Sequence, residues 1–266
     1  MNDILQKAPL LLGLVLTASI AQSPHSVFIE DLTWIEVRDA IDQGRTTIIV
    51  PTGGTEQNGP HMVLGKHNYL VKYKTGEIAN QLGDTLVAPV VAYVPEGDID
   101  PPTSHMRFAG TISIPEGVFA GVLEFTARSF KQHGFLDIAF IGDSGGNQAT
   151  QKLVAEKLNE EWTETNVRVH HVSDFYPGRG DDWVISQNIS AEDVGGHAGT
   201  HDTSSLLYLN PSMLRLNRMK PGRQGDGQGH TGNPAVSTPE FGERILKMQI
   251  EDAVGQITRQ RLAKRQ

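Results

Sequence analysis

Strand and helix patterns alternate along most of this chain, and that alternation limits its possible folds more than any other feature. Short runs of β-branched and apolar residues are typical of buried strands and lie at 46–51, 84–95, 110–115, 135–143 and 167–176. Longer segments with apolar residues three and four positions apart are typical of amphipathic helices and lie at 71–82, 115–133, 147–162, 203–210 and 239–262. Their order predicts an α/β fold, with a mainly parallel central sheet and helices on both of its faces.

The first residues differ in character from the rest of the chain. Residues 8–22 read APLLLGLVLTASIAQ, an apolar run that is too short and too rich in small residues for a comfortable membrane span. We predict a secretory signal peptide over residues 1–21, cleaved after Ala21, and a single α/β domain over residues 22–266. The mature protein is then expected to be exported, with a periplasmic location and no membrane segment. An apolar helix that stays attached as an anchor is the alternative.

Charge and cysteine content exclude several classes of function. The 23 basic and 31 acidic residues give a net charge of -8, which disfavours a protein built to bind nucleic acid or an anionic membrane. A small neutral or cationic molecule is the favoured ligand. The chain has no cysteine, so thiolate metal sites and cysteine nucleophiles are excluded, and nitrogen and oxygen atoms must hold any metal ion.

Two loops are expected to form the functional site. Parallel sheets bind their ligands at the carboxyl ends of the strands, and the loops 52–67 and 142–147 should converge there. These loops carry oxygen and imidazole groups that suit Zn, Mn or a similar divalent ion, namely Glu56, His61, His67, Asp143 and Ser144.

The second loop contains the letters GDSGG, which also surround the nucleophile of trypsin-like serine proteases. Here they join a buried strand to a helix in a cysteine-free α/β chain, and that context argues against such a protease. Gly142, Ser144 and Gly146 also satisfy the Gly-x-Ser-x-Gly pattern of a nucleophile elbow, but an elbow further needs a late histidine and an early oxyanion loop. We interpret Ser144 first as a turn residue, and a nucleophilic Ser144 stays an alternative.

Four segments, taken in order, resemble the creatininase (creatinine amidohydrolase) family. They are VPTGGTEQNGPHMVLGKHN at 50–68, HMRFAGTISIPEGVF at 105–119, IGDSGGN at 141–147 and GGHAGTHDTSSLLYLNPSML at 195–214. The resemblance implies a three-layer α/β/α sandwich that assembles as a homo-oligomer, usually a hexamer. It also implies a metal-dependent hydrolase that acts on a non-peptide or cyclic C–N amide bond of a small-molecule substrate.

The metal ligands that the resemblance implies are only partly kept. The family's first glutamate is retained as Glu56 and the histidine of its last segment as His197. The departures are Asn58 for a histidine, His67 for the bridging aspartate, Ser144 for the histidine of the glycine turn, and Asp202 for a glutamate. A bridging ligand needs two lone-pair sites, which a carboxylate offers and a neutral imidazole lacks. We therefore predict one ion, Zn or Mn, held by Glu56, His67 and Asp143, with no ion at all as the alternative.

Further roles follow for the other residues of the matched segments. His197 is expected to move a proton from a bound water to the leaving nitrogen, with Asp202 orienting it. The amides of Gly145 and Gly146 are expected to receive the developing oxyanion. The residues predicted to contact substrate are His61, His105 and Asn58.

Two rival functions remain open at this point. One is a periplasmic ligand-binding protein that kept the fold and lost the chemistry, because Asn58 and Ser144 stand where the family has histidines. The other is metal-free hydrolysis through Ser144, with His197 as its base.

Overall fold

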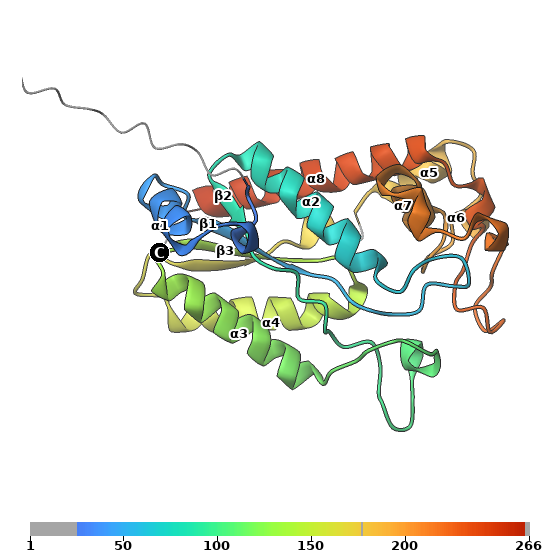
Figure 1. The fold of residues 1–266 in the computed structure, drawn as a ribbon, viewed down its shortest axis with the longest axis horizontal. Coiled ribbons are helices and arrows are strands. Elements are labelled where there is room, and N and C mark those ends of the chain that lie inside the picture. The colour runs from blue at the N-terminus through green and yellow to red at the C-terminus, as the bar shows by residue number, and fades with distance from the viewer. Residues whose placement is uncertain (1–25, 177, 264–266) are drawn as a thin grey trace, which may run out of the picture.

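The computed structural model describes residues 26–176 and 178–263, and within them the chain forms three layers (Figure 1). The middle layer is a parallel sheet with the strand order β2-β1-β3-β4. Its strands are β1 (Thr47–Thr52), β2 (Thr85–Val87), β3 (Asp137–Gly142) and β4 (Arg168–His171). The predicted α/β/α sandwich with a mainly parallel sheet is therefore confirmed. The predicted signal peptide, residues 1–21, lies outside the described residues.

Helices cover both faces of this sheet. α2 (Lys66–Leu82) and α8 (Pro239–Leu262) lie on one face, and α3 (Glu116–Gln132) and α4 (Gly145–Glu161) lie on the other (Figure 1). The other described helices are α1 (Trp34–Asp42), α5 (Gly180–Ser186), α6 (Ala191–Val194) and α7 (Thr200–Leu209). Short 3-10 helices lie at Ile29–Asp31, Ser104–Arg107, Ser173–Phe175, Pro211–Met213, Leu216–Arg218 and Pro234–Val236. Within the described part of the chain, every helix is too short or too polar to cross a bilayer.

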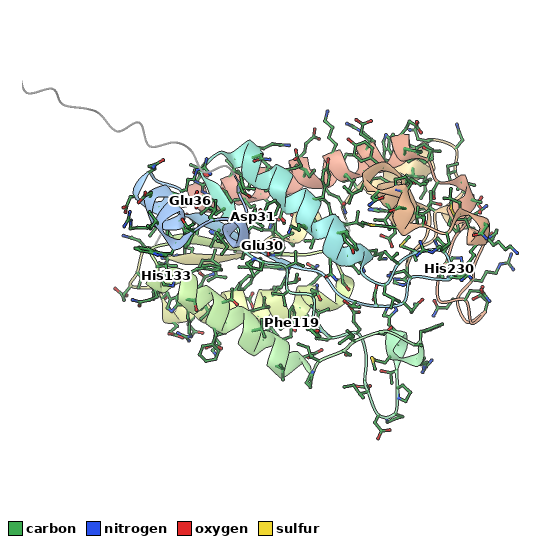
Figure 2. The ribbon with its side chains drawn as sticks, viewed as in Figure 1. Glu30, Asp31, Glu36, Phe119, His133 and His230 are labelled. Carbon is green, nitrogen blue, oxygen red and sulfur yellow. The ribbon has the colours of Figure 1, made fainter. Side chains whose placement is uncertain are left out.

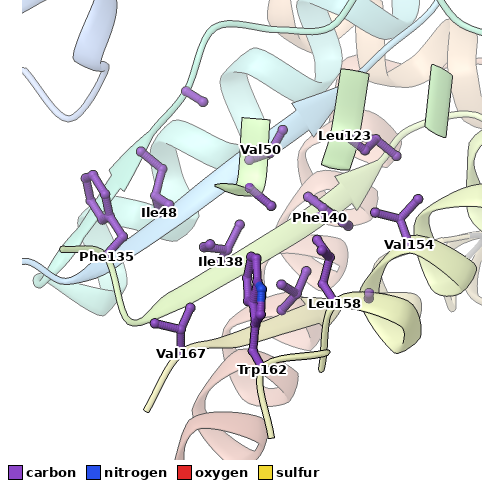
Figure 3. Close-up of a cluster of buried hydrophobic side chains, with 14 of the residues drawn as sticks. Ile48, Val50, Leu123, Phe135, Ile138, Phe140, Val154, Leu158, Trp162 and Val167 are labelled. Carbon is purple, nitrogen blue, oxygen red and sulfur yellow. The ribbon is translucent and has the colours of Figure 1, made fainter. Parts of the chain in front are cut away.

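The strand sequences explain how the two helix layers attach. Side chains alternate between the faces of a strand, so Ile48 and Val50 pack toward α3 and α4 while Ile49 packs toward α2 and α8. Figure 3 shows the cluster on the α3 and α4 side, where Ile138 and Phe140 of β3 add to it. Each such fully buried side chain contributes about 1.5–3 kcal/mol to folding. The strands are apolar on both faces because both faces are covered.

The structure differs from the predicted strands in three segments. The expected strand 167–176 forms β4 only over Arg168–His171, and the 3-10 helix Ser173–Phe175 follows it. Only Thr85–Val87 of the expected strand 84–95 joins the sheet, with one further bridge from Val91 to Thr52. Residues 110–115 make a single bridge, Ile112 to Thr55, because Gly110 has a φ of 89° and turns the chain out of an extended path. The unpredicted α1 did carry a start signal, since Thr33 and Glu36 form a capping box.

A close helix contact fixes the end of the molecule where α5, α6 and α7 gather (Figure 1). Gly242 of α8 faces the carbonyl oxygen of Ser204 on α7, and a Cβ at this glycine would lie only 2.0 Å from that oxygen. The missing side chain therefore lets α7 pack against α8 at backbone distance. This packing sets the position of Asp202, which α7 carries in its first turn.

Candidate active site

A cavity of about 1040 Å³ opens where the loops after β1 and β3 meet. The two loops lie side by side, because the side chain of Asn147 donates to the Gly53 carbonyl at 2.9 Å and the Asp143 amide donates to the Thr52 carbonyl at 3.1 Å. Among the residues that line the cavity are Glu56, His67, Glu96, His105, Asp143, Ser144, Gly145, Gly146, His197 and Asp202. The expected convergence of the loops at the carboxyl ends of the strands is therefore confirmed.

Three of the predicted ligands are in direct contact. His67 Nε2 lies 2.8 Å from Glu56 Oε1, and His67 Nδ1 lies 2.9 Å from Asp143 Oδ2. Burial and nearby Lys66 oppose a charge on the ring, but the two carboxylates outweigh them and raise the pKa of His67. Both ring nitrogens face carboxylate oxygens, so His67 in this arrangement directs neither nitrogen at the metal ion that it was predicted to hold.

Two buried lysines complete the charge balance of the cavity floor. Lys74 donates to Asp143 Oδ1 and, at 3.1 Å, to Gln249 Oε1, while its ammonium lies over the Phe175 ring. Lys66 donates to Asp202 Oδ2. Burial raises the pKa of each aspartate, but the neighbouring ammonium lowers it further, so both carboxylates stay charged.

The contacts of Asp202 differ from those expected. Its Oδ2 accepts from Lys66 and, at 2.9 Å, from the Ala198 amide, and no hydrogen bond joins it to His197 within the described residues. The first turn of α7 places the carboxylate back over the turn that precedes the helix, where the Ala198 amide needs an acceptor. Asp202 therefore holds Lys66 and the start of α7, and it does not orient the imidazole of His197.

A second group of side chains has the spacing of a metal site. Ligand atoms of Glu56, His105 and His197 all lie within 4.8 Å of one another. His105 Nε2 is 3.2 Å from Glu56 Oε2, and His197 Nδ1 is 3.6 Å from Glu56 Oε1. Burial is the main cause that lowers the pKa of both imidazoles, that of His197 to about 4, so both are neutral near neutral pH.

Gln57 determines which nitrogen of each imidazole carries the proton. The backbone carbonyl of Gln57 accepts from His197 Nε2 at 2.8 Å, which leaves Nδ1 with a lone pair facing Glu56. A metal-binding histidine is usually oriented by such a contact. The Gln57 side chain accepts from the Gly59 amide and donates to His105 Nδ1 at 2.9 Å, so the proton of His105 sits on Nε2. Glu56, His105 and His197 fit one ion once the side-chain amide of Gln57 rotates. His105 then carries its proton on Nδ1 and offers the lone pair of Nε2 to the ion.

Glu96 is a further acidic group in the cavity wall. The side chain is buried and its carboxyl group lies next to that of Glu56. Burial, followed by the charge of Glu56, raises the pKa of Glu96 to about 10, so it is protonated at neutral pH. The carboxyl group of Glu96 can occupy this position because residue 54 is a glycine. Gly54 has a φ of 154°, and a Cβ on it would lie 2.2 Å from Glu96 Oε1.

Comparison with known proteins agrees with this fold. The family model for creatinine amidohydrolase, "Creatininase", matches residues 30–257. The chain belongs to the creatininase family. The mycofactocin precursor peptide peptidase of Mycolicibacterium smegmatis is 27% identical over 234 residues, which cover 80% of this chain and 84% of that one. The creatinine amidohydrolase of Pseudomonas putida is 24% identical over 204 residues, which cover 73% of this chain and 76% of that one.

Solved creatininases share the fold of this family member. A structure described as "Creatininase Mn" has a TM-score of 0.76 at 20% identity, covering 89% of this chain and 99% of that one. A creatininase variant described as a Zn-Zn type has a TM-score of 0.68 at 22% identity, covering 90% of this chain and 100% of that one. Relatives of the creatininase fold thus include a manganese form and a two-zinc form.

Two residues of the creatininase-like segments do not reach the cavity. His61 is fully buried, its Nε2 lies 3.2 Å from Thr203 Oγ1, and its ring packs 5.0 Å from that of His230. Figure 2 places His230 at the end of the molecule that also holds α6 and α7. Asn58 is also fully buried and donates to the carbonyls of Glu56, Val63 and Leu64. Neither His61 nor Asn58 touches a substrate in this arrangement, because each is sealed inside its loop.

The start of α4 places the glycine-turn residues at the cavity. Ser144 is the N-cap of α4, and its Oγ has no hydrogen-bond partner among the described residues. Gly145 and Gly146 form the first turn of the helix, and a Cβ at Gly145 would lie 3.4 Å from the hydroxyl oxygen of Tyr176. The amides of this turn carry the partial positive charge of a helix N-terminus.

Sequence reasoning missed four polar side chains of this creatininase-family site. They are Gln57, Lys66, Lys74 and Glu96. Lys74 did carry a signal, because it stands between Leu70 and Ile78 at four-residue spacing, in the stripe of α2 that faces the core. A lysine at such a position needs a buried partner of opposite charge.

Proposed function

We propose that this protein hydrolyses a C–N amide bond at the cavity described above. The observation that carries the proposal is the group formed by Glu56, His105 and His197, whose ligand atoms lie within 4.8 Å of one another in the cavity wall. The relatives of this chain include a creatinine amidohydrolase and a peptide peptidase, and both names describe the cleavage of C–N amide bonds.

One divalent ion, Zn or Mn, is the proposed cofactor. Glu56, His105 and His197 would hold it, a mixed carboxylate and imidazole set of the kind found in catalytic zinc sites. When bound, such an ion supplies a Lewis acid and lowers the pKa of a coordinated water.

The proposed roles of the other residues follow from their positions. Glu96, which keeps its proton through neutral pH, is placed to give a proton to the leaving nitrogen, in place of His197. The amide of Gly146 in the first turn of α4 is placed to stabilise a developing oxyanion.

The cavity favours a neutral or cationic amide as substrate. Its outer wall carries the carboxyl groups of Asp98, Asp100, Glu116 and Asp181. The ammonium groups of the lining belong to Lys66 and Lys74, which are buried and paired with aspartates. The volume of about 1040 Å³ lies at the upper end for small-ligand pockets, so there is room for a substrate larger than a single ring. A small lactam and the end of a short peptide both fit this description.

A substrate screen tests the proposal. Lactams, simple amides and short peptides would be incubated with protein that has been treated with chelator and then reloaded with Zn or Mn. We expect turnover that depends on the ion and falls at least about 100-fold in Glu56→Gln, because that change removes a charged ligand. Glu164→Gln, at an exposed position away from the cavity, is the control and should keep full activity. Turnover that is unchanged by chelation and by Glu56→Gln would contradict the proposal.

A non-catalytic ligand-binding role is the second candidate. It is favoured by the internal ion pairs, which balance the buried aspartates without any bound ion. The same screen separates the two functions. A compound that binds tightly, is never converted, and keeps its affinity in Glu56→Gln would support ligand binding alone.

A further inference from the structure

We infer that the side chains of His67 and Lys74 occupy both oxygens of Asp143 as built-in hydrogen-bond donors, so that this half of the site does not accept a metal ion. The inference refines the proposed function, because it limits the site to the single ion beside Glu56. A creatininase variant of the same fold is described as a Zn-Zn type, so the fold itself has room for two ions.

The two donors come from one face of α2. His67 and Lys74 are seven residues apart, which is close to two full helical turns, so their side chains project in the same direction. His67 Nδ1 contacts Asp143 Oδ2 at 2.9 Å, and Lys74 Nζ contacts Asp143 Oδ1. Each oxygen of the carboxylate therefore has its own donor.

The ammonium of Lys74 is held in place on several sides. The residue is only 2% exposed, Gln249 Oε1 accepts from Nζ at 3.1 Å, and the Phe175 ring lies 4.4 Å from it. A buried ammonium without a counter-ion is strongly unfavourable, so Lys74 requires the Asp143 carboxylate. An ion at Asp143 would have to displace that ammonium and leave it buried and unpaired.

The neighbouring groups are also engaged with one another. Both ring nitrogens of His67 face carboxylate oxygens, and Asp202 Oδ2 accepts from Lys66 and from the Ala198 amide, so an ammonium stands beside this carboxylate too. The next residue in the glycine turn is Ser144, and a neutral hydroxyl is a weak ligand compared with imidazole. A second divalent ion would also stand close to a fixed positive charge, which opposes its binding.

Metal counting tests the inference without any assay of activity. The wild-type protein would be dialysed against excess Mn²⁺, the bound metal counted by plasma mass spectrometry, and its spin state examined by electron paramagnetic resonance. We expect no more than one Mn²⁺ per chain, with the spectrum of isolated ions. Two ions per wild-type chain, or a spin-coupled pair, would overturn the inference.

A double variant tests which residues exclude the ion. The His67→Asp, Lys74→Met protein removes both donors and adds a carboxylate beside Asp143, and we expect it to bind one more Mn²⁺ than the wild type. Lys72→Met, on the same helix but paired with Glu30 at the surface, is the control and should leave the count unchanged. Circular dichroism establishes that each variant is folded. A folded double variant that gains no ion overturns the role of the two donors, and if that variant does not fold, the wild-type count decides.

The two proposals fail in different ways. A wild-type protein without any bound ion, whose double variant gains one, supports the exclusion of a metal ion by His67 and Lys74 and removes the ion from the proposed function. A wild-type protein with a coupled pair of ions keeps the proposed hydrolase and overturns that exclusion.

Discussion

The side-chain amide of Gln57 donates to His105 Nδ1 at 2.9 Å and thereby sets the imidazole proton on Nε2, which faces Glu56. The amide is oriented in turn by the Gly59 N–H, which donates to Gln57 Oε1 at 3.0 Å. One glutamine therefore decides whether His105 presents a proton or a lone pair to the cavity. A carboxylate in its place would accept from Nδ1 and free Nε2 for an ion.

Gln57→Glu is therefore expected to tighten Zn²⁺ binding by about 10–100-fold, the range in which partners of metal-binding histidines act. Dissociation constants from competition with a chromogenic chelator would measure this. Gln57→Leu removes the donor without adding a charge, and it should tighten binding more weakly. Gln187→Glu, at an exposed position, adds the same charge elsewhere and serves as the control. Unchanged binding in both Gln57 variants would show that the tautomer of His105 does not limit affinity.

Glu96 should make the stability of the protein fall as the pH rises. The folded protein keeps this proton up to about pH 10, whereas the unfolded chain releases it near 4.5. The native state thus holds more protons than the unfolded state in this window, so the free energy of unfolding decreases with increasing pH. Glu96→Gln is neutral at every pH and should flatten the decline by about 1.4 kcal/mol per pH unit, which is roughly 4 kcal/mol between about pH 6 and about pH 9. Urea unfolding across that pH range measures the free energy of unfolding of both proteins. If this free energy changes with pH in the same way for the wild type and for Glu96→Gln, then Glu96 is ionised in the folded protein.

Ser144→Ala should leave the proposed hydrolysis nearly unchanged. Ser144 Oγ has no hydrogen-bond partner among the described residues, so no base is in position to activate it. We expect kcat/KM within about threefold of the wild type, whereas removing a true nucleophile costs about 10⁴–10⁶ in rate. Kinetics on a substrate from the screen, together with intact-mass analysis after a serine-reactive probe, would measure this. A labelled Ser144 and an inactive alanine variant would restore the serine hydrolase alternative.

The sequence predicts the fold well because its periodicity reports local structure. β1 and β3 are apolar on both faces, which is what a buried parallel strand requires, and each is found within one or two residues of its expected bounds. Residues 110–115 were misread because their β-branched composition fits a strand, whereas Gly110 and Pro115 make the chain turn. Helices α5 and α6 were missed since each is only two turns or less.

The candidate site is only partly visible in the sequence. Glu56 and Asp143 each follow one of two neighbouring parallel strands. The sequence therefore predicts that they lie near each other at the carboxyl ends of these strands. The contacts of Asp202 with Lys66 and of Gln57 with His105 join residues 136 and 48 positions apart, and no local pattern specifies such pairs. Buried lysines are rare enough that a sequence pattern assigns them to the surface by default.

Gly242→Ala should destabilise the protein through the contact between α7 and α8. Its Cβ would lie 2.0 Å from the Ser204 carbonyl oxygen, so the two helices must separate, and such overpacking costs about 1–3 kcal/mol. Because α7 carries Asp202, the shift should also loosen the Lys66 ion pair at the cavity. Gly121→Ala in α3 is the matched control, since its Cβ meets nothing within 4 Å and alanine favours a helix over glycine by about 0.5–1 kcal/mol. In chemical denaturation, the free energy of unfolding should therefore fall in Gly242→Ala and rise in Gly121→Ala. Equal changes in the two variants would mean that helix propensity, not the close approach of α7 to α8, decides the outcome at Gly242.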